Sequence, residues 1–373
     1  MNLSRQPAYW VFLLLVLGGF AIVGAEQFGY LSSYPQAWFL SILLLAAVAV
    51  PVGLIIYRLD QFEPEPASLI AIALLWGGVV ALSFAAIANS LFLTFLQNVL
   101  PSSQVESWGA SLVAPINEEF YKGVGLLMIF LIARAEIDSL MDGLVYGAMI
   151  GLGFQVMENV QYFIHAAAQS GDPGIGAVIG IFFVRVLIAG LYSHMLFTGL
   201  LGFGFAYFIT RRPTQPWARR ATVLAVFIFL AWAAHFVWNS PWLDSLMQGN
   251  SGAFVLALII KGLPFLVLLV LIGIFARRRE LRAFALLMAE EVGGDVVTHE
   301  EFHVLRSGRR RRRVARRVKR QKGAMAGRVV KRLMREQMNL ALFRSKVNQQ
   351  GHPAVEVQRN KIRQLKTQLA SMG

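Results

Sequence analysis

The sequence predicts an all-α protein, a polytopic bundle of about eight transmembrane helices followed by a basic C-terminal tail. Of its 373 residues, 56% are hydrophobic and 15% charged, and the mean hydropathy is +0.57, as expected for a chain that lies largely in lipid. Charge is uneven, because residues 277–373 contain 25 Lys and Arg against 8 Asp and Glu, whereas residues 1–276 contain 10 against 13. We therefore predict a membrane domain over residues 1–276. Residues 277–373 are predicted to be a cytoplasmic tail, partly helical or disordered. Its last stretch, about Val329–Ser371, is polar, with little apolar surface to form a core of its own.

Eight apolar runs are long enough to cross a bilayer as helices, which takes about twenty residues. They cover Tyr9–Ala25, Ala37–Tyr57, Ser68–Leu96, Trp108–Ala133, Gly143–His165, Arg185–Ile209, Thr222–Asn239 and Ala253–Ala276. The first run follows a lone arginine, as the apolar part of a signal peptide would, but it is long enough to span and lacks a convincing cleavage site. We predict that it is retained as the first helix.

The connections between these runs alternate in basic charge. The basic ones hold Arg5, Arg58, Arg134, four arginines within residues 211–220, and the tail, while the other four contain no Lys or Arg. Because basic loops stay in the cytoplasm, both termini are predicted to be cytoplasmic, and we expect a protein of the bacterial cytoplasmic membrane. The same alternation allows one crossing within Gly174–Ile209, so residues 174–184 are predicted to be an interfacial or re-entrant segment on the outer side.

The stretch APINEEFYKG, residues 114–123, interrupts the fourth run with Glu118, Glu119 and Lys122. Charged side chains at membrane depth are costly and usually face a protein interior or a wet cavity. A simple alternative is a buried ion pair between Glu118 and Lys122 that only fixes packing, but it leaves Glu119 unexplained. We therefore favour a functional site around these three residues.

Further polar clusters fall in the outer half of the bilayer when the predicted helices are oriented. They comprise Glu158 with Asn159 on the fifth helix, His194 about nine residues past Arg185 on the sixth, and His235 with Asn239 on the seventh. A lone intramembrane His or Asn is more often a hydrogen-bonded packing residue. Two histidines and three glutamates at one depth favour a functional site instead.

Glycine spacing predicts which face of each helix packs against a neighbour. The stripes are Gly143, Gly147, Gly151 and Glu158 on the fifth helix, and Gly190, His194, Thr198 and Gly202 on the sixth. Small residues along one face let helix backbones approach closely. Glu158 and His194 are therefore predicted to point into the bundle.

Taken in order, these clusters resemble the PrsW family of intramembrane proteases, which belongs with the CAAX prenyl protease and bacteriocin-processing superfamily. The matching motifs are Glu118-Glu119-x-x-Lys122, DGLVYGAMIGLGFQVMENVQY over Asp142–Tyr162, Arg185 with His194, Thr198 and Gly202, and His235-x-x-x-Asn239. Each motif is weak alone, but four in order with matching spacing make the resemblance specific. It covers about Ala114–Asn239, within a motif core of residues 108–239. Members closer to the CAAX proteases often have Arg where this chain has Lys122, which favours the PrsW branch.

The resemblance implies a peptidase that cuts a membrane-anchored protein at or near the outer bilayer surface. In the best-known members the substrate is an anti-sigma factor, whose cleavage starts regulated proteolysis. The implied catalytic residues are Glu118, Glu119, His194 and His235, with Asn239 beside them. We assign supporting roles to Lys122, Glu158, Asn159 and Arg185.

The chemistry available to these residues is hydrolysis by an activated water. The chain has no cysteine and no evident serine nucleophile, so a carboxylate is the natural base, and donors from His235 and Asn239 are placed to stabilise an oxyanion. His194, His235 and a carboxylate from Glu119 or Glu158 would also suit catalytic Zn²⁺ with one open position. Because the sequence has no HExxH signature, a metal-free glutamate mechanism is an equal alternative.

Two other functions are alternatives to a peptidase. A proton-coupled transporter also uses buried Glu and His, but this sequence shows no repeat between its halves. A non-catalytic membrane scaffold of the same fold is disfavoured because every motif position is retained.

The polybasic block Arg309–Arg320 contains nine basic residues and no acidic ones. It predicts attraction to anionic lipids at the cytoplasmic face, with nucleic acid less favoured for a segment tethered to the membrane. The sequence does not assign a role to Lys261 in the last apolar run.

Overall fold

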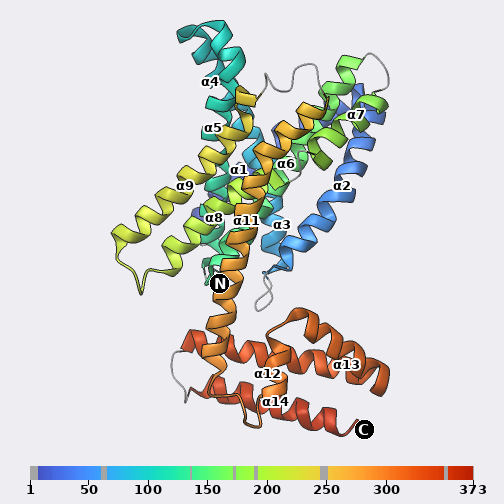
Figure 1. Ribbon diagram of the computed structural model, residues 1–373, viewed down its shortest axis with the longest axis vertical. Coiled ribbons are helices and arrows are strands. Elements are labelled where there is room, and N and C mark those ends of the chain that lie inside the picture. The colour runs from blue at the N-terminus through green and yellow to red at the C-terminus, as the bar shows by residue number, and fades with distance from the viewer. Residues whose placement is uncertain are drawn as a thin grey trace. The chain divides into compact units, whose positions relative to one another are not determined.

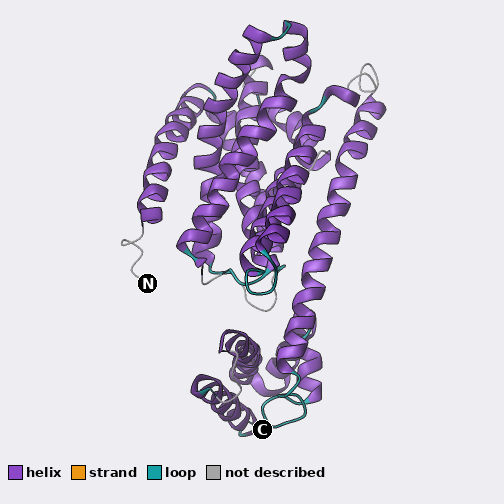
Figure 2. Ribbon diagram, turned by 90° about the vertical axis from the view of Figure 1, so that its left-hand side faces the viewer, coloured by secondary structure: helices purple, strands orange, loops and turns teal. Residues whose placement is uncertain are grey.

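The computed structural model describes residues 7–59, 65–134, 137–170, 174–188, 192–243, 251–347 and 352–372. Within these ranges the chain is helical apart from its connections and one isolated β-bridge between Val292 and Val297, which confirms the all-α prediction (Figures 1 and 2). The residues form two compact units, the first ending at Ile274 and the second including Phe275–Gly373.

Seven helical segments of the described chain are long and apolar enough to cross a membrane, so this is an integral membrane protein. They are α1 (Pro7–Ser33), α2 (Pro35–Tyr57), the run Ala67–Val99, α6 (Leu140–Ser170), α8 (Tyr192–Thr210), α9 (Trp217–Asn239) and Val255–Met288 of α11 (Ser251–Met288). The remaining crossing predicted from the sequence corresponds to α5 (Ser102–Ile132), which carries Glu118, Glu119 and Lys122 in its middle and is therefore less apolar than the seven.

Helix α6 is the centre of the first unit. In its apolar window 89% of residues are buried, against 17–22% in α1, α2, α9 and α11. The outer helices keep large apolar side chains exposed, such as Leu43 and Phe229, which suits a surface that faces lipid. The polar motif residues thus lie on and around the most enclosed helix of the bundle.

Glycines bring α6 and α8 into backbone contact. A Cβ atom added to Gly147 would lie 2.2 Å from the carbonyl oxygen of Thr198, and one added to Gly151 would lie 2.2 Å from that of His194. Gly143 meets Gly202 in the same way. Both stripes make the close backbone approach that was predicted, and the structure shows that they pack against each other; Gly190 lies outside the described residues.

The run Ala67–Val99 is not a uniform helix. It consists of α3 (Ala67–Leu75), a π-helical turn η2 (Trp76–Ala81) and α4 (Leu82–Val99). Gly77 packs so closely on α6 that an added Cβ would lie 1.9 Å from the carbonyl oxygen of Ile150. π-Helical turns of this kind are frequent at functional sites, and α4 carries Asn89 beyond it.

The segment before α8 differs from the sequence prediction. Arg185 lies in a π-helical turn, η4 (Phe183–Ile188), which continues α7 (Ile175–Phe182), and the described part of α8 begins at Tyr192. His194 lies in the first turn of the described part of α8, and the helical residues on its N-terminal side begin at Ile175, ten residues before Arg185. The short α7–η4 segment agrees with a single crossing between Gly174 and Ile209, and its position on the outer side stays a prediction.

The second unit has an apolar core of its own. It combines the end of α11 with α12 (His299–Leu305), α13 (Gly308–Val347) and α14 (Pro353–Ala370), and its buried residues include Met288, Leu333 and Ile362. The expectation of little apolar surface for a core was wrong. Apolar residues occupy only one face of each helix, so their contribution is hidden in the polar average of the segment.

Candidate active site

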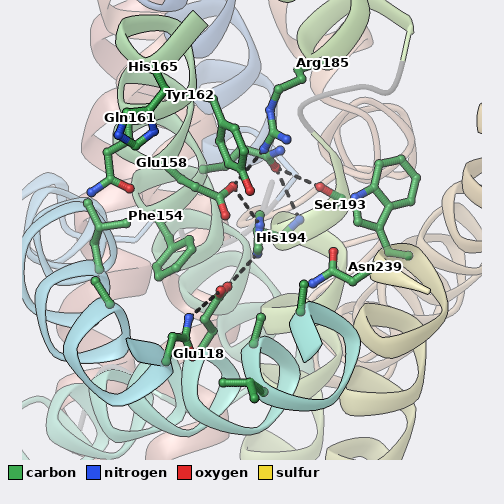
Figure 3. A pocket seen from close by; sticks show the side chains of 18 of the residues that line it. Glu118, Phe154, Glu158, Gln161, Tyr162, His165, Arg185, Ser193, His194 and Asn239 are labelled. Carbon is green, nitrogen blue, oxygen red and sulfur yellow. Dashed lines mark hydrogen bonds and ion pairs between the residues drawn. The ribbon is translucent and has the colours of Figure 1, made fainter. Parts of the chain in front are cut away.

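Four helices bring the predicted polar residues into one buried cluster. Glu118, Glu119 and Lys122 come from α5, Glu158 from α6, His194 from α8 and His235 from α9. Close packing of α6 and α8 through their glycines places Glu158 and His194 on facing sides. Figure 3 labels the three members that line the neighbouring pocket, Glu118, Glu158 and His194.

Lys122 is the hub of the cluster and is fully buried. Its Nζ lies 2.9 Å from Oε1 of Glu119, 3.2 Å from Oε2 of Glu118 and 2.7 Å from Nδ1 of His194. The Phe154 ring lies under the ammonium group, 3.8 Å from it. A buried ammonium group needs such partners to offset the loss of water. The predicted pair of Glu118 and Lys122 is present, but it is one contact of a larger network.

His194 is held from both of its ring nitrogens. Nδ1 faces Lys122, and Nε2 lies 3.3 Å from Oε2 of Glu158. The backbone N–H of His194 donates to Oε1 of Gln155, which also accepts from the Ser193 hydroxyl. These contacts fix the imidazole at the junction of α5, α6 and α8.

His235 is anchored by the second glutamate of the pair. Its Nδ1 lies 3.0 Å from Oε1 of Glu119, and its ring stacks on Phe197 with centroids 4.7 Å apart. Its Nε2 is directed to Glu118, 3.8 Å from Oε2, and Nδ1 of His194 lies at the same distance from that oxygen. Glu118 therefore lies between the two imidazoles.

The adjacent glutamates have different surroundings. Glu118 lines a pocket and accepts a hydrogen bond from Nδ2 of Asn89 at 3.3 Å. Glu119 is turned into the protein, where Thr198 donates to its Oε2 at 3.2 Å. Successive side chains on a helix point about 100° apart, so both cannot face the same space. The structure gives Glu118 the position in contact with a substrate-sized opening.

Arg185 lies at the opposite side of this pocket. It donates to Oε2 of Glu158 at 3.2 Å and to Oδ1 of Asn159 at 3.0 Å, and its guanidinium lies 3.5 Å from the centre of the Tyr162 ring. The side chain stays 29% exposed, so it borders the opening. Arg185 thereby orients Glu158, which in turn contacts His194.

The end of α9 is held at its carbonyl groups. The Asn239 carbonyl accepts from the Ser111 hydroxyl at 3.0 Å, and the Ser240 carbonyl accepts from Nζ of Lys261 at 2.5 Å. A cation suits the carbonyl end of a helix. This contact gives Lys261 a structural role that its sequence position alone did not reveal. The Asn239 side chain lines the pocket, as Figure 3 shows.

The pocket has a volume of about 400 Å³. One part of its wall is apolar and comes from α4 and α5, with Leu82, Ala86 and Val113 among its residues, whereas Glu118, Glu158 and Arg185 make the polar part. Such a combination of apolar wall and few converging polar groups is typical of a substrate site. His235 and Glu119 are buried outside the lining residues.

Several residues of the site were not predicted from the sequence. Asn89 bonds to Glu118 and itself accepts from Asn117 at 3.0 Å, while Gln155 supports the start of α8. Asn89 and Gln155 are polar residues within apolar runs, a signal that was available. Their partners lie 29 and 39 residues away in the chain, so the sequence could not say what they contact.

Comparison with known proteins agrees with this geometry. The sequence profile described as PrsW family intramembrane metalloprotease matches residues 65–274, more than half of the chain. The chain belongs to this family. It is 29% identical over 184 residues to Protease PrsW of Geobacillus kaustophilus (strain HTA426), covering 47% of this chain and 72% of that protein. It is 26% identical over 189 residues to Protease PrsW of Bacillus subtilis (strain 168), covering 49% and 77%. No experimentally solved structure matches the chain.

Membership of a metalloprotease family raises the question of which residues suit a metal. Among the described residues Glu118, His194 and His235 offer ligand atoms that all lie within 4.8 Å of one another. The set differs from the predicted one, because Glu118 takes the place of Glu119 or Glu158. Those two glutamates instead contact the outer nitrogens of the imidazoles, the usual position of carboxylates that orient metal-bound histidines. The donor set thus fits a metal ion when Lys122 is displaced from Nδ1 of His194.

Proposed function

We propose that this pocket hydrolyses a peptide bond of a membrane-anchored protein near the outer surface of the bacterial cytoplasmic membrane. The position of Glu118 carries the proposal, because it is the carboxylate that both lines the pocket and lies 3.8 Å from each of two imidazoles. The alternating loop charges support cytoplasmic termini and an outward-facing site.

Glu118 is proposed as the base. Its carboxylate accepts a proton from water while the water oxygen bonds to the carbonyl carbon of the substrate. The same proton then passes to the amide nitrogen as the C–N bond breaks, so that an amine and a carboxylic acid leave. The hydrogen bonds from Asn89 to Oε1 and from Lys122 to Oε2 hold the carboxylate in place.

The remaining residues position the catalytic groups and stabilise the charges of the reaction. Asn239 lines the pocket and supplies an amide N–H for the oxyanion that forms on the carbonyl oxygen. His235 was predicted to share that task, but its burial and its bond to Glu119 suit it better to orienting Glu118. Lys122 offsets the negative charge of both glutamates, and Arg185 with Asn159 holds Glu158 against His194.

The alternative to this metal-free scheme is one with Zn²⁺. Glu118, His194 and His235 would then hold the ion, a common ligand set for Zn²⁺, and Glu118 would be a ligand and not the base. When bound, the ion would act as a Lewis acid and lower the pKa of a coordinated water.

The substrate class follows from the position of the site in the membrane. A pocket built at the level of apolar helices meets chains that enter the bilayer, and we propose a regulator with one membrane anchor, such as an anti-sigma factor. The apolar wall from α4 and α5 would receive its side chains.

Cleavage of a reporter with a single-span anchor, by the purified protein in detergent, tests the proposal. We expect cleavage by the wild type and none by Glu118→Ala. Glu106→Gln on the same helix is the matched control, because Glu106 is exposed and is not among the residues that line the pocket. Absence of cleavage across a panel of anchored candidates, together with pH-driven solute uptake into vesicles, would establish a transporter instead.

A further inference from the structure

The first half of α13 carries an arginine stripe, which we define as Arg309, Arg312, Arg313, Arg316, Arg317 and Arg320. All six side chains are exposed, and together with Gln321 they border an open space of about 640 Å³. Residues three and four apart share one face of a helix, so the spacing of the six places their guanidinium groups along one side. The stripe concentrates positive charge on a single surface of the second unit.

Most acidic residues of this unit form ion pairs away from the arginine stripe. Their ion pairs join Glu290 and Glu291 to Arg344, Glu291 to Arg359, Asp295 to Arg363, Glu301 to Lys366 and Glu336 to Lys361. In the described part of the chain no ion pair involves a residue of the arginine stripe. Charge in the second unit is therefore balanced around α14 and left unbalanced on the first half of α13.

The fold holds the stripe facing outward. On the other face of the same half-helix Ala315 is buried in the core of the unit, and Val314 and Val318 pack against that core. Gly323, with φ 90°, breaks α13 and turns its second half back, so that a Cβ added to Gly327 would lie 2.7 Å from that of Lys319. Because the apolar face is committed to the core, the arginines present a preformed surface.

Guanidinium groups match phosphate oxygens in geometry as well as charge. We propose that the arginine stripe binds the phosphate headgroups of anionic lipids in the bilayer that α11 enters. The stripe begins 21 residues after the end of α11, a candidate span, so the chain itself keeps the unit within reach of a lipid surface. Lipid binding is thus assigned to one face of the polybasic block, and it does not depend on the peptidase assignment.

The test uses the full-length protein in lipid nanodiscs. The chain has no cysteine, so Met325→Cys, at a position that is 57% exposed, gives one labelling site near the stripe. Quenching of the label by spin-labelled headgroups is compared in phosphatidylcholine discs and in discs that also contain phosphatidylglycerol. We expect docking in the anionic discs alone, reversed by added salt because exposed charges are screened.

A matched pair of variants separates the stripe from net charge. The stripe variant replaces four stripe residues by Gln: Arg312, Arg313, Arg316 and Arg317. The control variant replaces by Gln four exposed basic residues on the second half of α13: Arg328, Lys331, Arg332 and Arg335. Docking should weaken roughly fivefold for each stripe arginine removed and hold in the control variant. Backbone hydrogen exchange of α14 shows whether both variants stay folded.

Three results would overturn the proposal. Equal loss in both variants would mean that only net charge matters. Equal docking with and without phosphatidylglycerol would exclude headgroup charge as the cause. Stripe-dependent binding of an oligonucleotide by the detergent-solubilised protein, with no docking to anionic discs, would assign the stripe to nucleic acid.

Discussion

Nδ1 of His235 and Oε1 of Glu119 lie 3.0 Å apart, an interaction that joins α9 to α5 across 116 residues of sequence. The contact fixes the orientation of the imidazole and leaves its Nε2 directed at Glu118. The two neighbouring glutamates therefore have unequal tasks, one at the pocket and one behind it.

Replacement of the two glutamates should reveal this inequality. Glu118→Gln removes the proposed base and should lower kcat on the order of a thousandfold. Glu119→Gln keeps an acceptor for His235 and should cost about 10- to 100-fold, as is usual for residues that orient a catalytic imidazole. Steady-state cleavage of the anchored reporter measures both, with Glu106→Gln as control. Equal losses would contradict the division of roles.

Metal content can be predicted from the donor set. In the scheme with Zn²⁺ we expect about one ion per chain by elemental analysis, lost together with activity in His194→Ala. Glu158→Gln should retain metal with lower affinity, because Glu158 contacts the outer nitrogen of His194. Activity that survives exhaustive chelation would exclude a catalytic metal and support the metal-free glutamate mechanism.

The contact of α6 with α8 should be intolerant of any side chain at Gly147. Its added Cβ would lie 2.2 Å from the Thr198 carbonyl oxygen, and overpacking of this kind costs about 1–3 kcal/mol. Gly147→Ala should therefore lower the melting temperature in detergent by several degrees. Gly180→Ala on α7 is the control, since an added Cβ there meets nothing within 4 Å. Equal melting temperatures for the two variants would refute the close approach.

Lys261 is predicted to act on catalysis through the end of α9. Lys261→Met keeps the length of the side chain and removes the charge that caps the Ser240 carbonyl. The helix end that carries Asn239 should loosen, with a fall of about tenfold in kcat and little change in KM. Lys261→Arg should restore most of the loss. Failure of arginine to rescue would indicate that the site requires lysine for another reason.

Acid should loosen the packing of α13 and α14. Burial raises the pKa of Glu336, but hydrogen bonds from Gln358, Lys361 and Asn339 outweigh it and place this pKa below its ordinary value. A carboxylate whose pKa is lower in the folded state stabilises the folded protein at pH values above its unfolded-state pKa. This stabilisation is lost as the pH falls through the folded-state pKa. Hydrogen exchange of α14 in the full-length protein should therefore quicken in acid.

Glu336→Gln should remove this pH dependence. At neutral pH the variant should exchange about tenfold faster, the loss expected for one charge-assisted hydrogen bond. Glu300→Gln, an exposed change on α12, is the control and should exchange like the wild type. A variant at Glu336 that keeps the acid response would place the titrating group elsewhere.

The sequence by itself indicated the membrane-crossing segments, the glycine faces of α6 and α8, and the charged residues and histidines that the structure brings together. Lipid imposes these features strongly, because a span needs about twenty apolar residues and a buried charge needs a partner. Gly143, Gly147 and Gly151 lie along one face of α6 and allow the backbone of a neighbouring helix to pack closely against that face. Each of these signals lies within a single helix and could be recognised without its partner.

Only the tertiary structure decided which glutamate faces the pocket, and that Asn89 and Lys261 support the site. Glu118 and Glu119 differ by one position on a helix, so their roles depend on how α5 is rotated against α4, α8 and α9. The core of the second unit was hidden for a related reason. Met288, Leu333 and Ile362 are separated by polar residues along the chain, and they become one apolar cluster only when the helices pack. Such contacts depend on the relative rotation and spacing of distant helices, which periodicity within each helix does not specify.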